Sequence, residues 1–87
     1  MKNLFAVIVY QSFDNDVPTY LFDNEDEAIS YAKQLYKEAY ETEERESAHG
    51  VDSERSYWDD DINEGAIFWN WEDDYMTFLV TNVTDKR

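Results

Sequence analysis

Carboxylates and tryptophans dominate residues 57–75, which read YWDDDINEGAIFWNWEDDY. This stretch holds seven acidic residues and three tryptophans but no Lys or Arg. Three kinds of chemistry use such residues: cation binding by carboxylate oxygens, catalysis by paired carboxylates, and imitation of a phosphate backbone in front of a positively charged partner. The spacing of the acids and the elements that hold them decide between the three.

Calcium binding is the first alternative, because Asp59, Asp61 and Asn63 match the first three ligand positions of an EF-hand loop. That loop also needs Gly at its sixth position and Glu at its twelfth, where this chain has Glu64 and Asn70. Two defining positions therefore fail. The pattern favours loose cation binding over a specific metal site, and we predict no bound metal.

Paired carboxylates beside Trp58, Trp69 and Trp71 would also suit a glycosidase or a sugar-binding protein. However, a chain with 21 acids contains many pairs by chance, and 87 residues supply little scaffold for a catalytic cleft. The only histidine, His49, lies beside Gly50 in an expected loop, so no Ser-His-acid arrangement is visible. We therefore predict that the protein is not an enzyme and uses no cofactor.

Length and composition indicate a single domain, residues 1–87, with a small core rich in aromatic side chains. No Cys is present, and no run approaches the roughly 18 apolar residues of a membrane span. The apolar residues near the N-terminus have the spacing of a strand and lack the cleavage site of a leader. These features predict a cytoplasmic protein that does not bind membranes.

Charge is the most unusual property of the chain, with 21 acids, 7 bases and a net charge of −14. Residues 41–74 hold 13 acids and 2 bases, whereas the rest of the chain holds 8 acids and 5 bases. Adaptation to high salt would spread acids over the whole surface. The concentration of charge in one segment instead favours a face that binds a cationic partner.

The secondary-structure signals place two strands before one helix. Residues 3–12 and 19–22 are rich in apolar and β-branched side chains and predict a hairpin. Asn24 and Glu27 have the spacing of a capping box, which predicts the start of a helix. Its apolar stripe reaches Tyr40, so the helix should end there or leave the core, with the carboxylates of residues 41–46 facing solvent. Residues 46–56 are predicted to form a loop.

Residues 66–71 and 75–84 predict a second hairpin with an acidic tip. The expected fold is α+β, a four-stranded antiparallel sheet with one long helix on one face, in the order ββαββ. A helix about 10–12 Å across cannot cover four strands spanning roughly 19 Å. Apolar surface should therefore remain on the other face, from Ile8, Tyr10 and Leu79 with either Phe68 or the Trp69 and Trp71 pair. Residues 45–60, a second subunit or a partner should cover it.

In size, charge, aromatic content and lack of a catalytic constellation, the chain resembles the small acidic DNA-mimic inhibitors of phages and mobile elements, which include anti-CRISPR and anti-restriction proteins. The resemblance implies an inhibitor that binds a cationic DNA-handling protein, most directly an RNA-guided CRISPR nuclease, in the host cytoplasm if the protein is phage-encoded. Acidic protein-interaction modules and small calcium- or sugar-binding proteins are the alternatives.

Carboxylates three residues apart on a helix, or two apart on a strand, are separated by about 4.5–6.6 Å, a spacing comparable to that of DNA phosphates. We therefore expect binding of a basic protein, no direct binding of nucleic acid, and self-association through the open sheet face. Trp58 should either anchor its loop or serve as an exposed contact. The candidate partner-binding residues are Glu38, Glu41, Glu44, Trp58, Asp59, Asp60, Asp61, Glu64, Glu72, Asp73 and Asp74.

Overall fold

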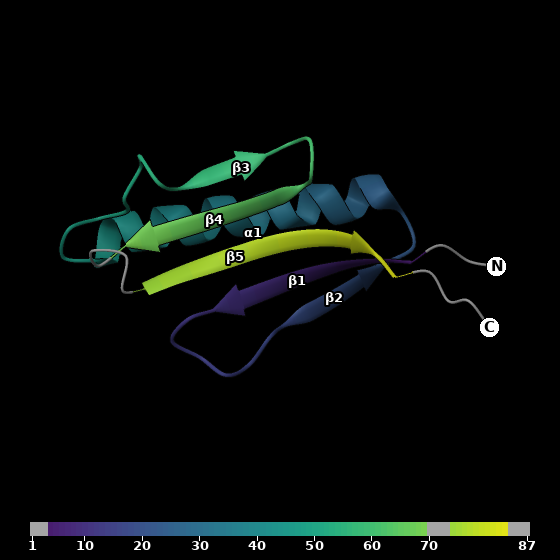
Figure 1. The fold of residues 1–87 in the computed structure, drawn as a ribbon, viewed down its shortest axis with the longest axis horizontal. Coiled ribbons are helices and arrows are strands. Elements are labelled where there is room, and N and C mark those ends of the chain that lie inside the picture. Colours follow the sequence, from purple (N-terminus) through teal and green to yellow (C-terminus); the bar gives the residue numbers. More distant parts are fainter. Residues whose placement is uncertain (1–3, 70–73, 84–87) are drawn as a thin grey trace.

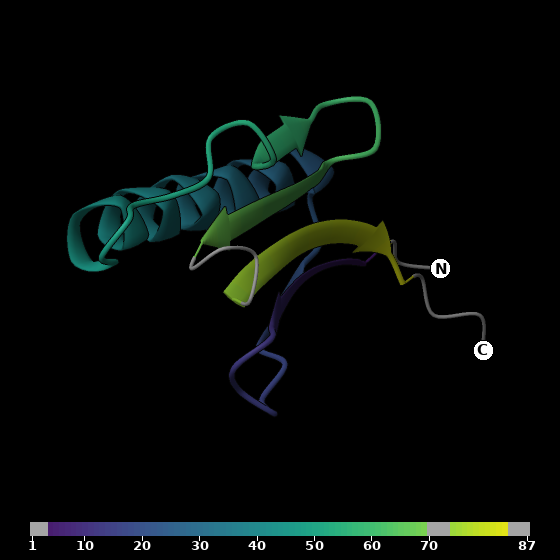
Figure 2. The same cartoon turned by 60° about the vertical axis from the view of Figure 1, so that its left-hand side comes forward.

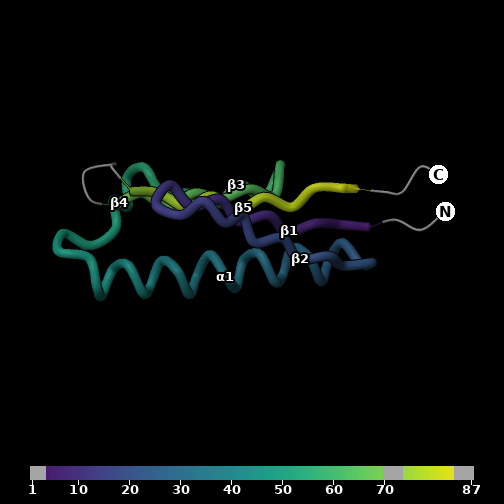
Figure 3. Tube along the Cα trace, turned by 90° about the horizontal axis from the view of Figure 1, so that it is seen from below, coloured from purple at the N-terminus to yellow at the C-terminus, as the bar shows by residue number. Residues whose placement is uncertain are grey.

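The computed structural model of the chain describes residues 4–69 and 74–83, and these form two layers (Figure 1). One layer is the helix α1, Glu25–Glu46, and the other is an antiparallel sheet of five strands. Seen from below, the helix covers one face of the sheet, and the described residues place nothing on the other (Figure 3). The α+β fold with one long helix on one face of an antiparallel sheet is therefore confirmed.

The sheet has the strand order β2-β1-β5-β4-β3. Its strands are β1 Phe5–Gln11, β2 Thr19–Phe22, β3 Tyr57–Asp59, β4 Glu64–Trp69 and β5 Asp74–Asn82. Strands β1 and β5, the first and last of the described strands, pair in the middle, with Val9 opposite Phe78. The β1–β2 hairpin forms one edge and β3 forms the other (Figure 2).

The prediction of four strands in the order ββαββ is wrong, because residues 57–59 form a fifth strand and the order is ββαβββ. The sequence pattern predicts an acidic loop here. The strand pairs with β4, and Trp58 lies opposite Gly65. Gly65 has no side chain, so the indole can lie over its backbone, where an added Cβ would be 2.5 Å from Trp58 Cε3. Three residues that lead directly into acidic ones are too short a run for strand periodicity to reveal.

The start of α1 agrees with the sequence. Asn24 is the N-cap, and its Oδ1 accepts a hydrogen bond from the backbone N–H of Glu27 at 3.1 Å. The helix continues beyond Tyr40 to Glu46. The prediction that all carboxylates beyond Tyr40 face solvent is wrong for Glu43, which is half-buried and accepts a hydrogen bond from Ser47 Oγ. Glu44 is exposed as predicted and also accepts a hydrogen bond from the Val51 N–H.

The core lies between the helix and the sheet in two adjoining clusters. Ala28 and Ala32 are fully buried, and their small size lets α1 approach the strands closely. Val51, from the loop after the helix, packs into the same layer and forms an isolated bridge with Trp69. Residues 47–56 therefore pack on the helix side through Val51 and are not the cover that the sequence suggested for the open face.

The composition of the open sheet face follows from strand alternation. Val7 and Val9 are buried against the helix, so Ile8 and Tyr10 point to the other side. Trp69 belongs to the helix-side core, so Phe68 is the residue that faces the open side. The sequence left these two alternatives undecided; the part involving Trp71 lies outside the described residues.

Candidate acidic partner-binding surface

The predicted site residues fall into three separate groups. Asp59 and Glu64 pair at one end of β4, flanking the turn of residues 60–63, and Asp74 pairs with Trp69 at the other end. Five residue steps of a strand separate these ends by roughly 17 Å. The third group lies on the helix. Glu72 and Asp73 lie outside the described residues, so the structure does not place the predicted hairpin tip beyond Asp74.

Asp60 is held by two donors rather than facing solvent alone. Lys33 Nζ lies 2.9 Å from its Oδ1, and Trp58 Nε1 donates a hydrogen bond to the same oxygen at 2.9 Å. The hydrogen bond from Lys33, followed by that from Trp58, holds the pKa of the Asp60 carboxyl below its ordinary value. Since Lys33 compensates this charge, Asp60 ties the acidic turn to the helix and adds little net negative potential.

Trp58 packs into the molecule more than it faces a partner. Its ring meets that of Tyr36 edge-on at 5.8 Å between centroids, lies over Gly65 and packs against both core clusters. Lys33 Nζ lies 6.0 Å from the ring centroid, within reach of a cation–π interaction. Of the two roles that the sequence left open for Trp58, this geometry favours anchoring of the β3–β4 turn.

The turn after β3 presents its remaining carboxylates in an ordered arrangement. The backbone N–H of Asp61 donates to Asp59 Oδ1 at 2.9 Å, and Asn63 adopts a left-handed φ of 52°. Asp61 is exposed, so its own carboxylate is available to a partner. Tyr57 OH donates to Glu64 Oε2 at 3.5 Å; partial burial, reinforced by the charges of Glu64 and Asp59, raises the pKa of Tyr57.

The helix carries Glu38, Glu41 and Glu44 at three-residue steps. Glu44 Oε2 accepts a hydrogen bond from the Val51 N–H at 2.8 Å, and a Cβ on Gly50 would lie 3.1 Å from Glu44 Oε1. Gly50 has a φ of +68°, which glycine adopts without strain. Glu38, Glu41 and Glu44 are all exposed, and Glu44 also closes the loop that follows the helix.

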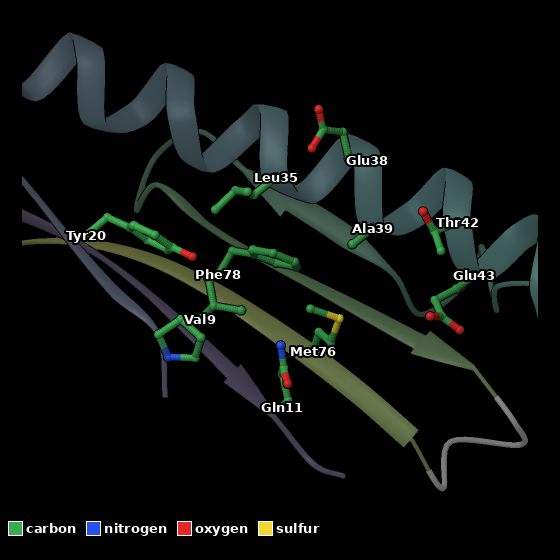
Figure 4. A pocket seen from close by; sticks show the side chains of 11 residues that line it. Val9, Gln11, Tyr20, Leu35, Glu38, Ala39, Thr42, Glu43, Met76 and Phe78 are labelled. Atoms are coloured by element: carbon green, nitrogen blue, oxygen red, sulfur yellow. The ribbon is translucent and has the colours of Figure 1, made fainter. Parts of the chain in front are cut away.

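A groove that sequence reasoning did not find lies between α1 and strands β1, β2 and β5 (Figure 4). Its volume is about 340 Å³. Apolar side chains form its floor, and the carboxylates of Glu38 and Glu43 stand on the helix side (Figure 4). The lining residues are Val9, Gln11, Pro18, Tyr20, Leu35, Glu38, Ala39, Thr42, Glu43, Met76 and Phe78. The signals for it were the four-residue β2 after Pro18 and the small Ala39.

Within residues 4–69 and 74–83, no three His, Cys, Asp or Glu side chains come together as a possible metal site. Among the described residues, no helix is both long and apolar enough to span a membrane. Comparisons with protein-family models, curated proteins and solved structures found no match to the chain.

Proposed function

We propose that this protein is an acidic inhibitor that occupies the DNA site of a cationic DNA-handling protein, with an RNA-guided CRISPR nuclease as the first candidate. The observation that supports the proposal is an imbalance of charge on a well-packed fold. Seven Lys and Arg side chains cannot pair with 21 acids, so at least 14 carboxylates have no basic partner of their own. None of the described charged side chains is buried, so the charge that they carry lies at the surface.

The exposed acids Glu38, Glu41 and Asp61 would make the direct contacts. Glu38 and Glu41 are separated by about 4.5 Å of helix rise, while successive phosphates of one DNA strand are about 3.4 Å apart along the axis. Lys and Arg side chains arranged for phosphates can therefore meet carboxylates at similar intervals. Asp59 and Glu64 would add charge beside the turn.

Four of the predicted residues would hold this surface in shape or lie apart from it. Asp60 and Trp58 fix the turn to the helix through Lys33 and Tyr36. Glu44 closes the loop behind the helix. Asp74, at the far end of β4, would contact only a partner large enough to span the sheet.

The mechanism would be competition for the cationic channel that reads the PAM or holds the DNA duplex. Long-range attraction between opposite charges speeds the encounter, and salt screens it. Inhibition should therefore depend steeply on ionic strength. A restriction enzyme, a DNA glycosylase or a histone-like protein would present the same sign of charge.

The test is displacement of fluorescently labelled duplex DNA from an RNA-guided nuclease, repeated with a restriction enzyme, a glycosylase and a histone-like protein. We expect the wild-type protein to release the DNA from at least one of these proteins, less effectively as salt rises. A Glu41→Gln, Asp61→Asn variant should release less DNA than an Asp14→Asn, Asp16→Asn variant, which loses the same charge in the loop of residues 12–18. The proposal would be rejected if the protein displaced DNA from none of the four proteins.

A second candidate, an interaction module that uses the open sheet face, is favoured by a row of aromatic rings across three strands. Tyr10 on β1 stacks on Tyr75 of β5 at 5.9 Å between centroids, and Phe68 of β4 lies 5.9 Å from the same ring. Hydrogen bonding with Tyr10 raises the pKa of Tyr75, which is consistent with a contact between the two hydroxyls. This surface could serve a second copy of the chain, and its test is given in the Discussion.

A further inference from the structure

We infer that the groove between α1 and β1 receives one large apolar side chain that is flanked by Lys or Arg in a basic peptide segment of the partner protein. The inference rests on the proposed function only for the sign of the partner's charge. It adds an apolar anchor to what would otherwise be recognition by charge alone.

The floor of the groove explains the apolar part of this specificity. Phe78 is 1% exposed and Val9 is 4% exposed, and both belong to the helix-side core. Leu35, Ala39 and Met76 are partly buried and pack against the same cluster. Ala39 contributes only a methyl group, so the space between the helix and the strands stays open at this point (Figure 4). An inserted side chain would extend a core that is already packed.

The rim of the groove explains why its ligand should be positively charged. Glu38 and Glu43 contribute two carboxylates, and no Lys, Arg or His occurs among the eleven lining residues. Ser47 Oγ donates to Glu43 Oε2 at 2.8 Å, which orients that carboxylate without neutralising it. Gln34 Nε2 donates to Glu38 Oε1 at 3.2 Å with the same consequence. An acidic or phosphorylated ligand would be repelled, whereas a basic residue beside the anchor can pair with either carboxylate.

The size of the groove limits what it can take. About 340 Å³ lies at the lower end of the range of small-molecule sites, roughly 300–1,000 Å³. Such a groove accommodates one aromatic or long aliphatic side chain, and Tyr20 and Thr42 can offer hydroxyls to the adjoining backbone. Wall residues come from both layers of the fold, so the site exists only once the helix has packed on the sheet.

Two fluorescein-labelled peptides test the inference by fluorescence anisotropy. One carries a tryptophan between two Lys-Lys pairs, and the other carries alanine at the centre with the same charge. Burial of the indole should tighten binding at least tenfold relative to the alanine peptide. Raising the salt concentration should weaken both peptides by a similar factor, because their charges are equal.

Variants of the groove provide the structural control. Thr42→Trp, or Gln11→Trp from the opposite wall, should fill the space and reduce the tryptophan peptide to the affinity of the alanine peptide. The use of two walls guards against a variant that fails to fold, which a circular-dichroism melt detects. Glu38→Gln and Glu43→Gln should each weaken binding by about two- to fivefold, the range of an exposed ion pair. Glu54→Gln, at an exposed carboxylate of the loop after the helix that does not line the groove, is the matched control and should have a smaller effect.

Equal affinity for the two peptides, or no change when the groove is filled, would overturn the inference while leaving the acidic inhibitor intact. The opposite pattern is also informative. If the tryptophan peptide binds in the groove but no DNA is displaced in the experiments above, the proposed function fails and the groove serves a basic partner of another kind.

Discussion

Trp58 of β3 and Gly65 of β4 lie opposite each other, and the indole occupies the space that a side chain at position 65 would need. An added Cβ would lie 2.5 Å from Trp58 Cε3 and 3.0 Å from Tyr36 Cδ2. Tyr36 belongs to the helix, and its ring and that of Trp58 contact each other and pack against the same core cluster. The position of the edge strand β3 and of the acidic turn therefore depends on the absence of a side chain at residue 65.

Gly65→Ala should consequently lower the free energy of unfolding by about 1–3 kcal/mol, the usual cost of overpacking a closed site. Urea unfolding measures the change. In a Trp58→Leu background the same substitution should cost less, because the shorter side chain does not reach the added methyl. Equal costs in the two backgrounds would show that the ring is not the obstacle.

The Lys33–Asp60 pair should make a pH-dependent contribution to stability. The pKa of Asp60 in the folded protein lies below its ordinary value of 3.8, so the stabilisation is complete above that pH and is lost as pH falls through the lowered pKa. Asp60→Asn and Asp61→Asn remove the same charge, but only Asp60 pairs with Lys33. We expect Asp60→Asn to melt at the lower temperature at pH 7.

The Lys33–Asp60 pair also predicts how the melting temperature changes in acid. Below the lowered pKa the wild-type Asp60 is itself protonated, so the wild-type protein and Asp60→Asn should converge in melting temperature. Thermal melts at pH 7, 5, 4 and 2.5 follow the trend. If the difference in melting temperature between the wild-type protein and Asp60→Asn did not change with pH, the stabilisation would be assigned to packing of Trp58 rather than to the ion pair.

Direct binding of nucleic acid should be absent. A net charge of −14 repels phosphates within a Debye length, and the basic residues of the described helix are few and partly paired. A gel shift with duplex DNA, single-stranded DNA and RNA at low salt is the measurement. Micromolar affinity for any of them would contradict both the expectation and the proposed mimicry.

Self-association through the open sheet face should strengthen with salt. The aromatic row offers an apolar surface, but two copies of charge −14 repel each other until counterions screen them. Sedimentation velocity from 50 mM to 1 M salt should show a growing dimer fraction. Tyr10→Lys, at a side chain that is 45% exposed, should abolish it, while Ser30→Lys on the exposed helix surface should not.

A monomer at high protein concentration and high salt would remove the second copy as the occupant of this face. Tyr10, Phe68 and Tyr75 would then be left for a different protein. The Tyr10→Lys variant keeps Glu41 and Asp61, so it separates the two surfaces. Loss of inhibition of a DNA-handling protein in this variant would assign binding to the aromatic face, whereas unchanged inhibition would assign it to the acidic surface.

Local sequence signals predicted the elements that depend on local chemistry. The Asn24 side chain caps the first turn as its spacing with Glu27 indicated, and residues 19–22 form the short strand that their composition suggested. The alternation of side chains along β1 correctly predicted that Ile8 and Tyr10 face away from the helix. Each of these features depends on residues that are close together in the chain.

The missed features depend on residues that are far apart. Strand β3 exists because Gly65 leaves room for Trp58, and Lys33 reaches Asp60 from a different element. The hydrogen bond from the Val51 N–H to Glu44 was not predicted, because nothing near Glu44 in the chain shows that Val51 folds back to it. The groove beside Ala39 is a space between layers, and periodicity describes the faces of elements but not the gaps between them.

The pairing of β1 with β5 sets an order for assembly during synthesis. In the chain, these central strands are separated by the helix and by strands β2, β3 and β4, yet seven residue pairs join them, from Phe5 and Asn82 to Gln11 and Met76. The β1–β2 hairpin and α1 can emerge from the ribosome with the inner side of β1 still unpaired. The sheet closes only when the last strand arrives, so folding should be late and all-or-none. A nascent chain stalled before residue 74 would expose an apolar strand edge, and it should be cleaved by proteases to which the finished protein is resistant.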